Sequence, residues 1–143
     1  MKIFILLVVL ITSILCGDSR YKIKGKVVTD RVSNLMWQRS DDGKKKSWNE
    51  ARNYCISLNL SGHKDWRLPS IDELVSIVDK EKFAPAINRE AFECKNSYYW
   101  SATEATDKGA KLTDARGVMF KNGNHMRYFK DYKDYVRCVR NSD

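Results

Sequence analysis

Two Ser-x-x-Glu motifs in the middle of the chain do most to limit what it can fold into. They are Ser47-Trp48-Asn49-Glu50 and Ser70-Ile71-Asp72-Glu73. Each matches the capping box, in which the serine and glutamate side chains satisfy free backbone N–H groups at a helix start. Apolar residues at helical spacing follow both motifs. The first helix is therefore predicted to end between Asn59 and Gly62, and the second to begin at Ser70.

Strand-like segments flank the two predicted helices. Residues 21–28 alternate apolar and basic side chains, which is the period-two pattern of a half-buried strand. Further strands are predicted at residues 35–38, 98–101 and 135–140. Strands on both sides of two helices predict a single α+β domain.

A β-hairpin is predicted near the end of the chain. Asn122-Gly123 separates the apolar segments 117–120 and 125–128. This dipeptide is typical of a type I′ turn, in which both central residues have a positive φ. Residues 103–114 are polar without a period and are predicted to form an exposed loop.

The first 17 residues have the composition of a secretory signal peptide. Lys2 precedes the apolar run 3–11, and small or polar residues lead to Gly17. A transmembrane helix needs about 20 apolar residues, and no segment reaches that length. We therefore expect residues 1–17 to be a removed signal peptide and residues 18–143 to form an exported domain, in the periplasm, at the cell surface or secreted. The alternative is that Cys16 is kept and carries a lipid, instead of being removed with the signal peptide.

Three cysteines remain after the signal peptide, namely Cys55, Cys94 and Cys138. An oxidising compartment favours a disulfide, and the odd number leaves one thiol over. We favour Cys55–Cys138, which joins a predicted helix to a predicted strand and closes a long loop. Pairings that use Cys94, in a loop-like segment, are the alternatives.

Five segments together resemble a known family. They are, in chain order, Leu35-Met36-Trp37-Gln38, Trp48-Asn49-Glu50-Ala51, Asp65-Trp66-Arg67-Leu68-Pro69-Ser70-Ile71-Asp72-Glu73-Leu74, Tyr99-Trp100-Ser101-Ala102-Thr103 and Tyr135-Val136-Arg137-Cys138-Val139-Arg140. They resemble the Lcl C-terminal domain family, named after the end domain of a bacterial collagen-like adhesin. The resemblance implies a C-type-lectin-like α+β fold, with two helices and a mixed, mainly antiparallel sheet whose first and last strands lie near each other. It also favours the Cys55–Cys138 disulfide, and the adhesin's end domain implies binding to sulfated glycosaminoglycans.

The motif residues are expected to build the core and its loops. The four tryptophans lie within apolar segments, where large rings organise a small core. Asp65 and Arg67 are expected to fix the loop before the second helix by hydrogen bonds. The residues assigned to structural roles are Trp37, Trp48, Asp65, Trp66, Arg67, Pro69, Glu73 and Trp100.

The sequence contains no pattern typical of a catalytic, metal or cofactor site. His63 and His125 share no motif, and the cysteines form no CxxC pair. The Trp-Asn-Asp motif of calcium-dependent lectins is replaced here by Trp48-Asn49-Glu50, at a predicted helix start. We therefore expect a protein that is not an enzyme and that binds neither a cofactor nor a metal.

The formal net charge is +8 at pH 7, from 26 Lys and Arg against 18 Asp and Glu, so polyanions are the expected partners. The basic residues gather in Lys44–Lys46, with Arg39 and Arg52 nearby, and in residues 127–140, where aromatic residues alternate with them. Lys and Arg bind sulfate and carboxylate groups, and aromatic rings pack against sugar faces. The candidate ligand-binding residues are Lys44, Lys45, Lys46, Arg127, Lys130, Lys133 and Arg137.

These observations predict an exported binding module for an acidic or sulfated glycan, if the two basic stretches share a face. Export makes nucleic acid an unexpected partner. The alternative is a structural or protein-interaction domain of the cell envelope without a small ligand. Such a domain would act through the 103–114 loop and the hairpin tip at Asn122-Gly123.

Overall fold

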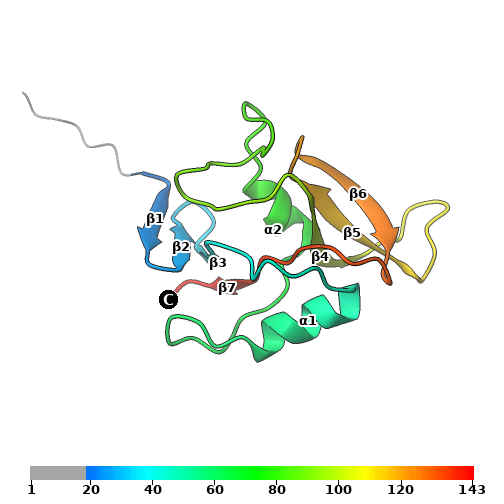
Figure 1. The fold of residues 1–143 in the computed structure, drawn as a ribbon, viewed down its shortest axis with the longest axis horizontal. Coiled ribbons are helices and arrows are strands. Elements are labelled where there is room, and N and C mark those ends of the chain that lie inside the picture. The colour runs from blue at the N-terminus through cyan, green and yellow to red at the C-terminus, as the bar shows by residue number, and fades with distance from the viewer. Residues whose placement is uncertain (1–18) are drawn as a thin grey trace, which may run out of the picture.

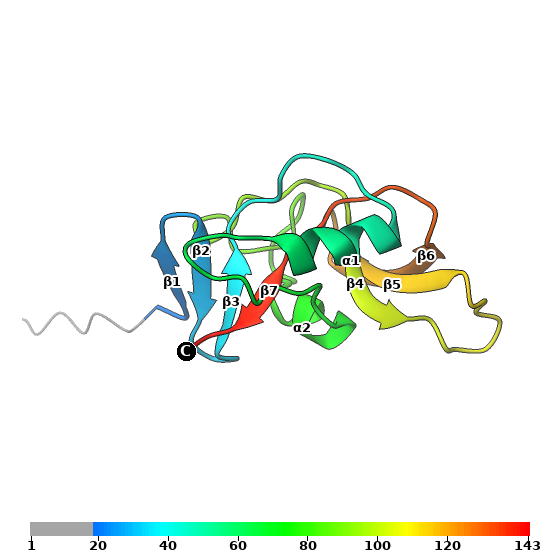
Figure 2. The ribbon, with the colours of Figure 1, turned by 90° about the horizontal axis from the view of Figure 1, so that it is seen from below.

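The computed structural model describes residues 19–143, so the predicted signal peptide and Cys16 lie outside the described residues. Two antiparallel sheets lie side by side, with α2 between them and α1 along one side of the molecule (Figures 1 and 2). The first sheet has the order β1-β2-β3-β7 and the second the order β4-β5-β6. The strands are β1 (Tyr21–Lys24), β2 (Val27–Asp30), β3 (Leu35–Gln38), β4 (Tyr98–Glu104), β5 (Asp114–Met119), β6 (Asn124–Phe129) and β7 (Val139–Asn141).

Both predicted helices are confirmed. Helix α1 spans Trp48–Ser57 and helix α2 spans Ile71–Ser76, and each begins with a complete capping box. In α1 the Ser47 hydroxyl accepts from the backbone N–H of Glu50, and the Glu50 carboxylate accepts from the backbone N–H of Ser47. The helix ends at Ser57 because Leu58 has an extended backbone, slightly before the predicted end.

The predicted α+β class, with two helices and mainly antiparallel strands, is confirmed, with one difference at the first strand. Residues 21–28 form two paired strands, β1 and β2, and not one. Gly25 turns the chain with a φ of +59°, a conformation that glycine adopts without a Cβ clash. The first and last strands share a sheet, although β1 and β7 occupy its opposite edges.

The last strand is shorter than predicted because residues 134–139 pair with several different segments. Asp134 pairs with Lys46, and Tyr135 forms a parallel bridge with Tyr99 of β4. Val139 then pairs with Arg67 on one side and with Trp37 of β3 on the other. This C-terminal segment therefore connects the two sheets and the loop before α1.

The predicted hairpin of β5 and β6 is confirmed, but its turn type is wrong. Only Gly123 in the turn has a positive φ, +80°. The backbone N–H groups of Asn122 and Gly123 both donate to the carbonyl of Met119, so residues 120–123 form a longer loop. The predicted 103–114 loop also shortens, because β4 extends to Glu104 and β5 begins at Asp114.

The core consists of two clusters, and all four tryptophans are buried in them. Trp37 packs in the first cluster with Leu74 and Phe92. The other three tryptophans surround the second cluster, which includes Cys55 and Cys138.

The Cys55–Cys138 disulfide is confirmed, and it ties α1 to the C-terminal segment. Cys94 is free and half-buried. Burial raises the pKa of its thiol, although the nearby Arg137 opposes the rise, so Cys94 is a poor nucleophile at neutral pH. The pairings that used Cys94 are therefore excluded.

Neither described helix, within residues 19–143, is both long enough and apolar enough to span a membrane.

Candidate anion-binding groove

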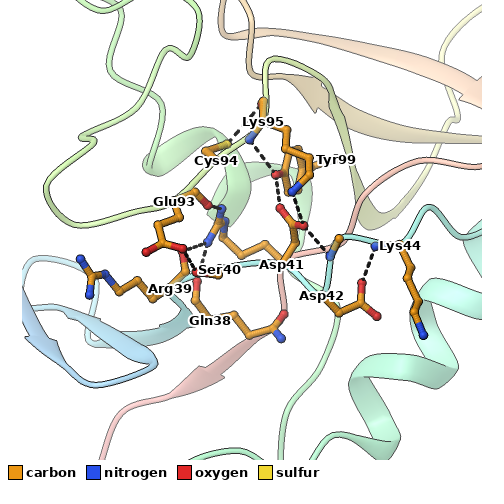
Figure 3. A network of polar contacts seen from close by, with 12 residues as sticks. Gln38, Arg39, Ser40, Asp41, Asp42, Lys44, Glu93, Cys94, Lys95 and Tyr99 are labelled. Carbon is orange, nitrogen blue, oxygen red and sulfur yellow. Dashed lines mark hydrogen bonds and ion pairs between the residues drawn. The ribbon is translucent and has the colours of Figure 1, made fainter.

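The loop that enters α1 presents the Lys44–Lys46 run. Its shape is fixed by two aspartates: Asp41 accepts from the backbone N–H of Gly43 at 2.8 Å, and Asp42 accepts from that of Lys44 at 3.0 Å. Figure 3 shows the Lys44 side chain extending away from these contacts. The lysine run is therefore held by a local hydrogen-bond frame that leaves the Lys44 ammonium group free of it.

Asp41 anchors this loop to the rest of the domain. Its carboxylate accepts hydrogen bonds from the Tyr99 hydroxyl and the Lys95 ammonium group (Figure 3). Burial acts to raise the pKa of Asp41, but the hydrogen bonds from Tyr99 and Lys95 outweigh it and hold the pKa below its ordinary value. Asp41 is therefore ionised at neutral pH, and its charge is matched by Lys95.

The C-terminal segment brings one further lysine to the same place. Lys46 and Asp134 exchange both backbone hydrogen bonds, at 2.8 and 2.9 Å, and Trp48 donates its backbone N–H to the carbonyl of Lys130. These contacts place Lys133 beside the start of α1, where its ammonium nitrogen lies 4.0 Å from Glu50 Oε1. Two basic stretches that are far apart in sequence thus meet.

Between them lies an open groove of about 640 Å³, which we call the lysine groove. Exposed Lys44, Lys45 and Lys133 and half-buried Lys46 are on its walls, and Tyr54 and Leu58 of the α1 side provide apolar surface. The complete set of lining residues is Lys44, Lys45, Lys46, Glu50, Asn53, Tyr54, Ser57, Leu58, Asn59 and Lys133.

The lysines of the groove differ in how they are engaged. Lys46 donates to Asp42 at 2.6 Å and lies over the Tyr54 ring, so its charge is already balanced. Lys45 lies over the Tyr135 ring, 5.5 Å from its centre. Within residues 19–143, no carboxylate lies within ion-pair distance of Lys44 or Lys45. These two ammonium groups are available to an anion, whereas Lys133 already has a 4.0 Å ion pair with Glu50 that an anion would share.

The α1 side of the groove was not among the predicted site residues. Glu50, Asn53, Tyr54, Ser57 and Leu58 lie at spacings of three and one along the helix, which places them on one face. That face follows directly from the predicted helix. The sequence does not show which side of the helix the Lys44–Lys46 loop covers, because tertiary contacts decide this.

Two of the predicted binding residues lie outside the lysine groove. Arg127 pairs with Asp107 at 2.8 Å, on the β4–β5 loop. The Lys130 ammonium group donates to Glu104 at 2.8 Å and to the carbonyl of Leu112. Of the candidate residues in the 127–140 stretch, only Lys133 lines the groove, so the condition that the two basic stretches share a face is met by this residue alone.

Arg137 is a clear correction to the predicted set, because no ligand can reach it. Its side chain is fully buried, and its guanidinium donates to the carbonyls of Gln38, Arg39 and Glu93, each at 2.6 Å. The alternating pattern of the segment suggested an exposed face. The guanidinium instead lies in the interior, where its hydrogen bonds link the end of β3 to the loop that contains Glu93.

The motif residues make the structural contacts expected of them. Arg67 donates twice to the Glu73 carboxylate, at 2.6 and 2.7 Å, and Asp65 accepts from Arg140 at 2.7 Å. The carbonyl of Pro69 accepts from the backbone N–H of Ala102. The indole nitrogens of three tryptophans donate to backbone carbonyls; these are Trp48 to Ser101, Trp66 to His63 and Trp100 to Lys46.

Within residues 19–143, no group of three or more His, Cys, Asp or Glu side chains is arranged to hold a metal ion.

Asp134, whose backbone pairs with Lys46, gives the domain a pH dependence. Burial raises the pKa of Asp134 to about 6, with Lys45 opposing the rise. The folded state then binds more protons than the unfolded state between about pH 4 and 6, so stability falls as the pH rises through this range. Asp134→Asn should remove the fall, which amounts to about 3 kcal/mol at most at 1.36 kcal/mol per unit.

Urea unfolding at pH 4 and pH 8 measures this effect. Asp134→Asn should match the wild type at pH 4 and exceed it at pH 8. Asp131→Asn, at an exposed neighbouring position, is the control and should show no such difference. An Asp134→Asn protein that differs from the wild type equally at both pH values contradicts the prediction.

Comparisons with known proteins give one family and several similar structures, two of which are described here. The model of the Lcl C-terminal domain matches residues 26–140. The crystal structure of botrocetin is similar with a TM-score of 0.48 at 10% identity, covering 86% of this chain and 97% of that one. The structure of EMS16, an antagonist of the collagen receptor integrin alpha2beta1, is similar with a TM-score of 0.48 at 13% identity, covering 86% and 98%. No curated protein matches the chain.

Proposed function

The chain belongs to the Lcl C-terminal domain family, and from this premise we propose that it is an exported binding module that holds an acidic or sulfated glycan in the lysine groove. The observation that carries the proposal is the meeting of Lys44 and Lys45 with Lys133 across one groove. Their ammonium groups supply positive charge along its length. An extended polyanion satisfies several of them at once.

The apolar surface of the groove favours a sugar over a compact inorganic anion. Leu58 provides aliphatic surface in the groove, and Tyr54 provides the part of its ring that Lys46 leaves uncovered. Sugar faces carry C–H groups that pack against such surface, while sulfate or carboxylate substituents project to the sides. Glu50 supplies a hydrogen-bond acceptor for a hydroxyl group, since hydrogen bonding by the backbone N–H of Ser47 holds its pKa below the ordinary value.

Export is proposed from two observations. The Cys55–Cys138 disulfide is typical of proteins that fold in an oxidising compartment. The apolar run of residues 3–11 has the length and flanks of a signal peptide. Removal at residue 17 and lipid attachment at Cys16 both leave the described domain outside the cytoplasm.

Removing three charges from the lysine groove should weaken heparin binding strongly. In Lys44→Gln/Lys45→Gln/Lys133→Gln the side-chain stems are kept and three cations are lost. At about 0.7 kcal/mol for each exposed contact, the dissociation constant should rise about thirtyfold. Titration calorimetry with a heparin dodecasaccharide measures it, and the elution salt on a heparin column gives an independent value.

The matched control removes the same number of charges elsewhere. Lys80, Lys82 and Lys121 are exposed and do not line the lysine groove, so Lys80→Gln/Lys82→Gln/Lys121→Gln should change the constant less than threefold. Equal losses in both triple variants would mean that only net charge matters. Elution of the wild type below about 0.2 M salt would likewise contradict multivalent binding.

A second candidate function, protein interaction, rests on a different surface. Leu112 is 91% exposed on the β4–β5 loop, which lies at the end of the molecule opposite β1 (Figures 1 and 2). Lys130 donates to the carbonyl of Leu112, and the exposed rings of Phe129 and Tyr132, on either side of Lys130 in the chain, contact each other. Exposed apolar side chains that gather at one place are typical of interaction surfaces. If the lysine groove variants bind heparin like the wild type, this candidate takes precedence.

A further inference from the structure

A second, smaller cavity lies next to the lysine groove. It has a volume of about 430 Å³ and is formed by the β1–β2 turn, the end of β3 and two neighbouring loops. We call it the Arg39 pocket. Its lining residues are Gly25, Lys26, Gln38, Arg39, Ser40, Asp41, Leu60 and Glu93.

Among the described residues, Arg39 is the arginine of this pocket whose guanidinium has no hydrogen-bond or ion-pair partner. Its Nε is buried without a hydrogen-bond partner, and no described carboxylate lies within ion-pair distance of its guanidinium. Figure 3 shows the side chain extending away from Glu93 with no polar contact drawn from its guanidinium. An unpaired guanidinium on a pocket wall favours a carboxylate or sulfate, which it binds through two parallel hydrogen bonds.

The other charged groups of the Arg39 pocket define the ligand further. Lys26 adds a second exposed cation without an ion-pair partner among the described residues. Asp41 is already matched by Lys95, as shown above. Glu93, whose carboxylate accepts from the Ser40 hydroxyl, remains able to accept further hydrogen bonds. A pocket with two cations and a free acceptor suits a unit that carries both an acidic group and hydroxyl groups.

The Arg39 pocket and the lysine groove meet at one hydrogen bond. Gln38, which lines the pocket, donates from Nε2 to the hydroxyl of Tyr54, which lines the groove, at 3.0 Å. The chain after α1 also borders both cavities, because Asn59 lines the groove and Leu60 lines the pocket. A polymer lying in the groove therefore has a neighbouring cavity for its next units.

We propose that the Arg39 pocket is a second subsite for the same acidic glycan, holding one acidic sugar unit beyond the part of the chain bound in the lysine groove. This inference rests on the proposed function. It adds a length requirement that the groove alone does not impose, because a short oligosaccharide fills the groove without reaching Arg39.

Oligosaccharide length gives the test. Arg39→Gln/Lys26→Gln removes both cations while keeping their stems, and heparin tetra-, octa- and dodecasaccharides serve as probes in titration calorimetry. The tetrasaccharide should bind the variant and the wild type equally. The dodecasaccharide should bind the variant about tenfold more weakly, so the gain in affinity with length is lost.

The matched control is Lys22→Gln/Lys24→Gln, which removes two exposed charges from the same β1–β2 hairpin outside the pocket. It should keep the length dependence of the wild type. Arg39→Lys, which keeps the charge without the paired donors, should recover part of the dodecasaccharide affinity. Thermal unfolding of each variant shows that it is folded.

The outcomes separate this inference from the proposed function. If the Lys44/Lys45/Lys133 variant loses binding while Arg39→Gln/Lys26→Gln keeps the full length dependence, the subsite is wrong and the groove stands. If only the Arg39 variant weakens binding, at every length, the pocket is an independent site and the shared subsite is overturned. We expect both variants to lose heparin affinity. The loss in Arg39→Gln/Lys26→Gln should be confined to the long oligosaccharides.

Discussion

Arg137→Met should lower the free energy of unfolding by about 4 kcal/mol. The guanidinium donates three hydrogen bonds of 2.6 Å to backbone carbonyls and lies between the rings of Phe92 and Tyr99. Methionine fills much of the volume but removes the donor to the carbonyls of Gln38 and Glu93, while the carbonyl of Arg39 keeps its hydrogen bond from the backbone N–H of Glu93. Each unsatisfied buried carbonyl costs about 1–3 kcal/mol.

The measurement is urea unfolding followed by tryptophan fluorescence. Arg137→Lys separates charge from geometry, because one ammonium group keeps the cation but does not reproduce the donor fork that serves two loops. Arg137→Lys should recover less than half of the free energy of unfolding that Arg137→Met loses. Arg89→Met, at an exposed arginine that donates one hydrogen bond to the carbonyl of Phe83, is the control and should change stability by less than about 1 kcal/mol. An Arg137→Met domain as stable as the wild type would show that the carbonyls of Gln38 and Glu93 find other donors.

Removing the disulfide should have a similarly large effect. Cys55 and Cys138 are 83 positions apart, so the cross-link excludes many conformations of the unfolded chain. In the chain-entropy description this contributes about 4 kcal/mol, a large part of the 5–15 kcal/mol by which domains are usually stable. Cys55→Ala/Cys138→Ala should therefore unfold at much lower urea concentration than the wild type under non-reducing conditions.

Cys94→Ala is the control, because Cys94 forms no disulfide. It should leave stability nearly unchanged. Thiol titration of the unfolded, unreduced chain from residue 18 should find one thiol in the wild type and none in Cys94→Ala. A thiol that persists in Cys94→Ala would show that Cys55 and Cys138 are not joined.

The features that the sequence predicted best are those decided within a few residues. Both helices begin where their capping boxes place them, because a cap is a contact between positions three apart. The hairpin was also recognised locally, although its turn differs. The single strand predicted for residues 21–28 was wrong, because these residues form two strands joined by a turn at Gly25. The alternation of apolar and basic residues continues through Gly25, so the pattern does not reveal the turn.

The candidate site could be predicted only in part, because it depends on which segments meet. Lys133 belongs to the lysine groove because Asp134 pairs with Lys46, a long-range contact with no local signature. Arg137 is also basic and lies only four positions after Lys133, yet it is buried. Whether a basic residue faces solvent or the interior is decided here by the carbonyl groups that it meets after folding.

The position of residues 134–141 has a consequence for the order of assembly. Synthesis proceeds from the N-terminus, so β3, Lys46 and Cys55 are made long before the residues that pair with them. Until those residues are released, one edge of the first sheet is unpaired and the lysine groove lacks Lys133. Folding of the domain therefore awaits nearly the whole chain, as expected where long-range contacts dominate. The lysine groove is therefore completed only after the C-terminal residues of the domain have been made.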